Sequence, residues 1–172
     1  MRPMSRGPKR LAHPSLLLTA VFAELLALAI GPAAHPEPAA ASTASTMESY
    51  IVSMVNSARH SRGVPALRVG SKLTDLAGSR ATTLARTTVL SHPSCLGCTY
   101  ASWDISWRAC GEAIAMTTYA WGYQAARSVF LGWKNSPGHW SLLMSRSYTR
   151  IGVGVAYRSS NHSTWAAADL AG

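Results

Sequence analysis

The chain has 172 residues, of which 48% are hydrophobic, so it can form one domain with a single core and has little room for a second. Its 16 lysines and arginines outnumber its seven acidic residues, which gives a formal net charge of +9. The basic residues are spread along the chain rather than clustered, and this pattern argues against a specific nucleic-acid partner.

The N-terminal region has the order of segments typical of a secretory signal peptide. Basic residues within the first ten positions precede an apolar run at 15–30, and the small-residue motif Ala39-Ala40-Ala41 follows as a cleavage site. We expect a signal peptide at 1–41 and a secreted, extracellular protein. Glu24 interrupts the apolar run, which is short for a membrane span, so an uncleaved N-terminal anchor is the alternative.

The remaining chain is predicted to be a short linker at 42–45 and one domain at 46–172. Ser45 and Glu48 form a possible capping box, after which apolar residues recur at helical spacing until about Arg62. A second helix is expected from Ser71, which can serve as its N-cap. This helix carries an apolar face made of Leu73, Leu76, Ala77 and Leu84.

The middle of the chain is less regular. The stretch from Ser91 to Trp107 is interpreted as a structured loop, because it contains Pro93, Gly97 and two cysteines. The segment Gly111–Met116 is short enough to be a strand or a turn, and Glu112 lies at its start.

The C-terminal third predicts two helices followed by two strands. The first helix covers about Tyr123–Trp133, and Ser136-Pro137 starts a second one, with Ser136 as N-cap and proline at the first helical position. Residues 151–157 alternate branched or aromatic residues with small ones, as in a strand over whose glycines another element packs closely. The closing strand is expected at 163–170.

Three cysteines are present, Cys95, Cys98 and Cys110. In an oxidising compartment two of them should pair, and we favour Cys95 with Cys110 over Cys98 with Cys110. A bond between Cys95 and Cys98 would close a tight ring. A closed zinc site made of His92 and the three cysteines is a further alternative, which export makes less favourable.

Four of these segments together resemble the CAP superfamily (cysteine-rich secretory, antigen 5, pathogenesis-related-1) in its short bacterial form. They are Leu90-Ser91-His92, Gly111–Ala115, Ser136-Pro137-Gly138-His139 and Ile151–Val155, in that order. The resemblance covers about residues 46–170. It implies an α+β fold, namely a three-layer α-β-α sandwich.

The same resemblance implies three site residues. His92 matches the first histidine of the family's cleft, Glu112 its first acid and His139 its second histidine. Two imidazoles and a carboxylate suit Zn²⁺ or a similar divalent metal, so His92, His139 and Glu112 are the expected metal ligands.

The chain also departs from the family pattern. Ser136 stands where the fuller pattern has a second acid, and Ala113 replaces the asparagine after the glutamate. Trp140 and Leu142 replace polar residues after His139, so we assign Trp140 to a groove for an apolar ligand. A general base needs oriented polar support, and these changes therefore favour binding over hydrolysis.

These observations predict a secreted protein that binds a lipid, a sterol or another cell-envelope component. Its basic charge would attract anionic polymers and lipid headgroups, and membrane association would be peripheral unless the N-terminal anchor is retained. The alternative is a metal-dependent hydrolase of peptide or cell-wall substrates, with Glu112 as general base. A third hypothesis is an effector that another protein recognises without any metal.

Overall fold

The computed structural model describes residues 38–172, and side chains from Thr43 onward. The helices are α1 (Pro38–His60), α2 (Ser71–Thr87), α3 (Leu96–Ser102), α4 (Tyr123–Lys134) and α5 (Pro137–Leu143), with a short 3₁₀ turn at Ser159–Asn161. The strands are β1 (Arg68–Val69), β2 (Cys110–Thr117), β3 (Arg150–Arg158) and β4 (Ser163–Ala171).

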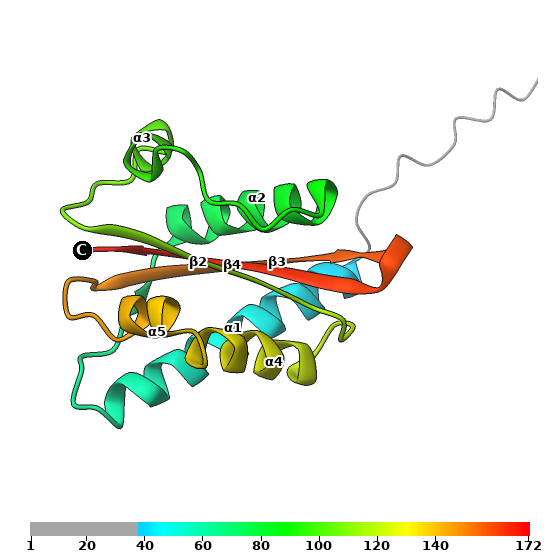
Figure 1. Ribbon diagram of the computed structural model, residues 1–172, viewed down its shortest axis with the longest axis horizontal. Helices are drawn as coiled ribbons and strands as arrows, with labels where there is room; N and C mark the ends of the chain where they lie inside the picture. Colours follow the sequence, from blue (N-terminus) through cyan, green and yellow to red (C-terminus); the bar gives the residue numbers. More distant parts are fainter. Residues whose placement is uncertain (1–37) are drawn as a thin grey trace, which may run out of the picture. The chain divides into compact units, whose positions relative to one another are not determined.

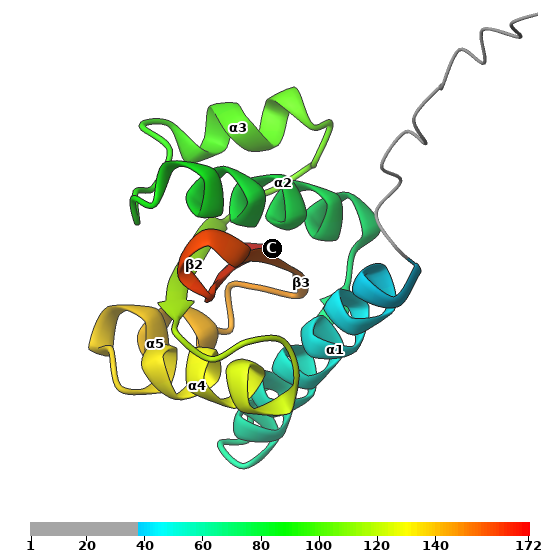
Figure 2. The ribbon, with the colours of Figure 1, turned by 90° about the vertical axis from the view of Figure 1, so that its right-hand side faces the viewer.

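The four strands form one mixed sheet in the order β1-β3-β4-β2. β1 pairs parallel with β3, whereas β3 with β4 and β4 with β2 pair antiparallel. Helices α2 and α3 cover one face of the sheet, and α1, α4 and α5 lie on the other (Figures 1 and 2). The predicted α+β class and three-layer arrangement are confirmed.

The glycines of β3 explain how α2 packs on the sheet. A Cβ atom at Gly152 would lie 2.0 Å from the carbonyl carbon of Leu73, and one at Gly154 would lie 2.1 Å from the amide nitrogen of Gly78. The backbone of α2 therefore rests directly on the strand, and no side chain fits between them. This confirms the close packing expected from the alternation of residues 151–157.

A buried arginine fixes the connection that follows α5. Arg59, on α1, is only 1% exposed. Its guanidinium group donates hydrogen bonds to the carbonyl oxygens of Leu143 and Ser145 at 2.7 and 2.9 Å. It also donates to the carbonyl oxygens of Pro65 and Tyr148. These contacts hold the C-terminal end of α5, and with it the helix that carries His139, against α1.

Several local predictions differ from the structure. The stretch predicted as a structured loop contains the seven-residue helix α3, and residues 42–45, expected to be a linker, lie within α1. Gly70, and not Ser71, occupies the N-cap position of α2.

The predicted signal peptide lies mostly outside the described residues. Within residues 38–172 no helix is long and apolar enough to span a membrane.

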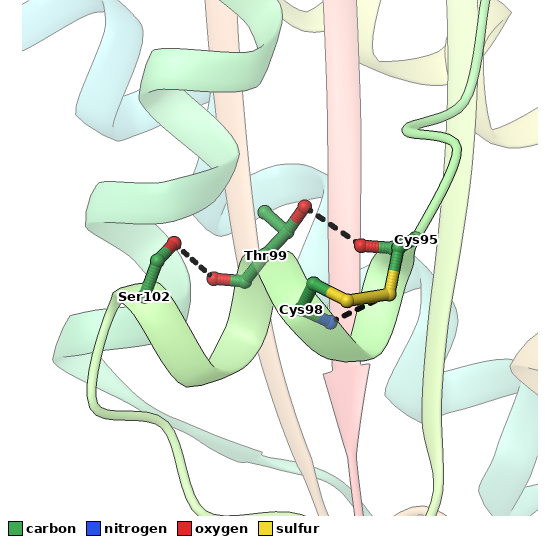
Figure 3. Close-up of a disulfide and its surroundings, with 4 residues drawn as sticks. All are labelled: Cys95, Cys98, Thr99 and Ser102. Carbon is green, nitrogen blue, oxygen red and sulfur yellow. Dashed lines mark hydrogen bonds between the residues drawn. A yellow bond between two sulfur atoms is a disulfide. The ribbon is translucent and has the colours of Figure 1, made fainter.

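The predicted pairing of Cys95 with Cys110 is wrong, because the structure joins Cys95 to Cys98 (Figure 3). The reason is the unpredicted helix: Cys95 is the N-cap of α3, and Cys98 follows in its first turn, where its amide donates to Cys95 Sγ. Residues three apart at a helix start share one side, so the two sulfurs meet. Cys110 begins β2 as a free, half-buried thiol whose pKa is raised by burial and by Asp169.

Candidate functional site

Glu112 lies near the start of the edge strand β2, on the face covered by α2. The preceding residue, Gly111, leaves no room for a side chain on the opposite face, because a Cβ there would lie 2.6 Å from Tyr148 Oη and 2.7 Å from Leu142 Cδ1. Since side chains alternate along a strand, Glu112 points toward α2. Its side chain is only 1% exposed, so the carboxylate requires polar partners within the protein.

Arg80 of α2 supplies one of these partners. Its Nε lies 2.5 Å from Glu112 Oε1, and its terminal nitrogen Nη2 lies 3.3 Å from Oε2. The same Nη2 donates to the carbonyl oxygen of Ser91 at 2.7 Å. Arg80 thus forms a fork on the carboxylate and also holds the loop residue that precedes His92.

His92 is the second partner of the carboxylate. Its Nδ1 lies 2.6 Å from Glu112 Oε2, while more than half of its side chain is exposed. With an ionised carboxylate as acceptor, Nδ1 carries the proton and Nε2 is left free on the solvent side. A carboxylate behind a histidine is a common way to fix the tautomer and orientation of a ligating imidazole.

His139 lies beside His92, although the two come from different layers. The ring centroids are 6.5 Å apart, with the rings tilted by 56°. His139 belongs to α5, on the opposite side of the sheet from α2, so the two histidines meet beside the outer edge of β2. Partial burial lowers the pKa of His139, and the neighbouring His92 lowers it further, which favours the neutral imidazole.

A second carboxyl group lies behind Glu112 in the sheet. Asp169 of β4 is the direct cross-strand neighbour of Glu112 and is fully buried. Its Oδ1 accepts a hydrogen bond from the Tyr100 hydroxyl of α3 at 3.1 Å, while Oδ2 has no hydrogen-bond partner within the described part of the chain. Burial raises the pKa of Asp169 to about 7, and the nearby Glu112 raises it as well.

The structure therefore brings together the three residues that the resemblance predicted, but in a different relation. Glu112 contacts His92 and Arg80. The groups that remain to bind a ligand are Nε2 of His92 and the neighbouring imidazole of His139. Trp140, predicted to belong to a ligand groove, is partly exposed; its ring packs against Phe130, and the guanidinium of Arg62 lies 5.0 Å above it.

Sequence reasoning missed Arg80 and Asp169, although both have a signal. Arg80 lies three residues after Ala77 and four before Leu84, so it falls on the apolar face predicted for α2. Asp169 follows three alanines in a strand that is buried along its whole length. A charged residue on a buried face is expected to have a partner, and that rule would have selected both.

The residues fit a divalent metal only in part. His92 offers a free Nε2, and the lowered pKa of His139 favours the neutral form that binds metals. Glu112 is already engaged on both oxygens, and residues 38–172 contain no group of three His, Cys, Asp or Glu side chains placed to hold a metal ion. The disulfide between Cys95 and Cys98 also removes two thiolates from the alternative zinc site.

Comparisons with known proteins agree with this fold. The family model described as CAP, the cysteine-rich secretory protein family, matches residues 52–168. No protein with a curated description matches the chain.

Solved structures give a consistent result. An extracellular protein with an SCP domain from Bacillus anthracis superimposes with a TM-score of 0.64 at 20% identity, over 74% of this chain and 41% of that protein. An outer surface protein from Borrelia burgdorferi gives a TM-score of 0.64 at 18% identity, over 73% of this chain and 91% of the other. A cysteine-rich secretory protein from Staphylococcus aureus gives 0.58 at 17% identity, over 75% and 39%. The chain thus spans less than half of two of these relatives.

Proposed function

Because the chain belongs to the CAP family of cysteine-rich secretory proteins, we propose that it is an exported binding protein for a lipid, sterol or other apolar cell-envelope component. The binding surface is formed by His92, His139 and the apolar residues that precede His92. The observation that carries this proposal is the engagement of Glu112 by both Arg80 and His92.

A general base must reach the proton that it removes. Glu112 is almost fully buried, and each of its oxygens faces a donor at 2.5 to 3.3 Å. It is therefore suited to orient His92 rather than to activate a water molecule. This geometry supports the alternative, a metal-dependent hydrolase with Glu112 as base, less well than it supports binding.

The surface next to His92 is apolar. Val89 and Leu90, in the segment that leads from α2 to His92, are 54% and 51% exposed. Two adjacent aliphatic side chains in water favour contact with an apolar ligand, because each can bury further surface. Beside them, His139 can donate a hydrogen bond to a polar head group of the same ligand, and Nε2 of His92 can accept one.

We further propose that the two histidines can hold a divalent ion such as Zn²⁺ with only two protein ligands. An ion bound there would supply a positive, Lewis-acidic contact for an oxygen atom of the ligand. Within the protein, Glu112 fixes the tautomer of His92 and Arg80 holds Glu112 in place. Weak and exchangeable binding is expected, since structural zinc sites have four ligands and catalytic ones have three.

The test uses a neutral, soluble lipid, dihexanoylphosphatidylcholine below its micellar concentration, titrated into the full-length chain and followed by NMR. We expect saturable shifts centred on residues 89–92 and His139. In the double variant V89S/L90S the affinity should fall by about tenfold, because two apolar contacts are lost. Y123S, which changes a similarly exposed apolar side chain at the start of α4, is the control and should leave the affinity unchanged.

The metal part is tested by calorimetric titration of Zn²⁺ into the wild type, H92A and H139A. Loss of binding in both variants is expected. Lipid shifts that do not saturate, or that persist unchanged in V89S/L90S, would overturn the proposed binding function. Zinc binding that is indifferent to both histidines would overturn the two-ligand site alone.

A further inference from the structure

A second feature lies at the opposite edge of the sheet, away from the histidines. β1 pairs with β3 over two residues only, and β3 then continues beside α1. Between α1, β1 and the start of α2 lies a pocket of about 360 Å³, which we call the β3-edge pocket. This volume is within the range of sites for small molecules.

The walls of the β3-edge pocket combine two kinds of side chain. Val52 of α1, Val69 of β1 and Val153 of β3 give it apolar sides. Ser45, Ser49 and Ser53 also line it; they are spaced four residues apart and so lie along one face of α1. A ligand here would find serine hydroxyl oxygens along the wall formed by α1, the Thr74 side chain at the start of α2, and valine carbon on the other sides.

Glu48 is the only ionisable residue that lines this pocket among the described residues. Its Oε1 accepts a hydrogen bond from the backbone amide of Val155 at 3.2 Å, which fixes the side chain at the strand edge. Glu48 forms no ion pair within residues 38–172, unlike Glu112. Burial raises the pKa of Glu48, and no ion pair within residues 38–172 offsets this effect.

We propose that the β3-edge pocket binds a small alkylammonium ion, with its charged group at Glu48 and its hydrocarbon chain against the three valines. The charge argument is specific to this place, because the chain carries a net charge of +9 and yet no lysine or arginine of residues 38–172 lines the pocket. An organic cation would provide the missing counter-charge.

The hydrogen-bonding capacity of the site matches this ligand. An ammonium group has three donors and no acceptor. The Glu48 carboxylate and the serine hydroxyl oxygens are acceptors, and Ser49 keeps its oxygen lone pairs while its hydroxyl donates to the Ser45 carbonyl. An anion would face the carboxylate, and a neutral alcohol would gain no ion pair. The proposal goes beyond the binding function of the histidine surface and does not depend on it.

The experiment titrates n-hexylammonium, n-hexanol and hexanoate into the full-length chain, with calorimetry for affinity and NMR for location. We expect hexylammonium to bind with one-to-one stoichiometry at least about tenfold more tightly than hexanol, and hexanoate not to bind. The variant E48Q should lose about tenfold or more in hexylammonium affinity. Its amide oxygen can still accept from Val155, so the strand edge is preserved.

Two further variants test separately the effect of an acidic charge outside the pocket and the effect of filling the pocket. D75N removes an exposed acid of α2 that does not line the pocket, and it should bind hexylammonium within about twofold of the wild type. S53F should fill the pocket and weaken binding without changing the charge. Equal affinities for hexylammonium and hexanol, unchanged binding by E48Q or S53F, or no saturable binding would each overturn the proposal. The H92A variant should bind hexylammonium normally.

Discussion

A glutamate lies at each edge of the sheet, Glu112 on β2 and Glu48 on the neighbouring helix α1. Both are shielded from solvent to some extent, and they differ in their partners. At the β2 edge, Glu112 contacts Arg80 and His92. At the β3 edge, Glu48 contacts only a backbone amide among the described residues and lines an open pocket. A carboxylate that is already neutralised orients a neighbouring side chain, whereas one that lacks a cation remains free to recognise one. Glu112 and Glu48 are the same residue type, and their different roles therefore follow from their different partners.

The largest effect is expected from removing the cation at the β2 edge. In R80M, Glu112 stays buried without its guanidinium partner, and the free energy of unfolding should fall by about 3–5 kcal/mol. R80K, which keeps the charge but loses the fork, should fall between R80M and the wild type. Urea denaturation measures both.

The control for this prediction is R127M, which removes an exposed arginine of α4. Its effect should remain within about 0.5 kcal/mol. If R80M proved no less stable than R127M, the contact of Arg80 with Glu112 would not support the site, and the β2 edge would no longer differ from the β3 edge.

The next effect concerns Asp169, which lies on the inner strand β4 directly across from Glu112. Its pKa is raised from 3.8 to about 7, so the folded protein disfavours the ionised form, and stability should be lost as the pH rises from about 4 to about 7. In D169N this loss disappears, while the amide oxygen still accepts from Tyr100. The variant should exceed the wild type by up to about 4 kcal/mol above pH 7.

Denaturation midpoints at pH 4, 6 and 8 check this prediction, with D75N as a control for an exposed acid. The difference between D169N and the wild type should grow across this range. A difference that stays constant with pH would mean that Asp169 does not change its protonation there, and that Tyr100 alone accounts for its place in the fold.

The architecture could be predicted largely from local patterns. Apolar spacing located the helices that became α2 and α4, and the glycines of β3 indicated the close approach of α2 that the structure contains. The family resemblance brought His92, Glu112 and His139 to one place. The helix α3 was missed because seven residues are too short for a periodic signal, particularly next to proline, glycine and cysteine.

The relations within the site could not be predicted in the same way. Glu112 was expected as a metal ligand, but its role depends on Arg80, which lies 32 residues earlier and reaches it only once α2 packs on β3 and β4. The pairing of Cys95 with Cys98 likewise depends on α3, a helix that the sequence did not predict. Spacing along the chain identifies candidate groups, whereas the side chain that neutralises each group is decided by packing between layers.

The smallest effect is expected at the β3 edge, in the absence of any ligand. Burial raises the pKa of Glu48 above 4.5, so ionisation is disfavoured in the folded state, and stability should decline slightly as the pH rises from about 4.5 through that raised value. Because Glu48 is partly exposed, E48Q should gain less than about 1 kcal/mol above this window and nothing below it. Adding hexylammonium should reverse the order of the two proteins, since only the wild type then gains an ion pair. Thermal unfolding at pH 4 and pH 7, with and without hexylammonium, checks this prediction. If the ligand does not stabilise the wild type relative to E48Q, Glu48 only accepts the hydrogen bond from the Val155 amide and does not bind a cation.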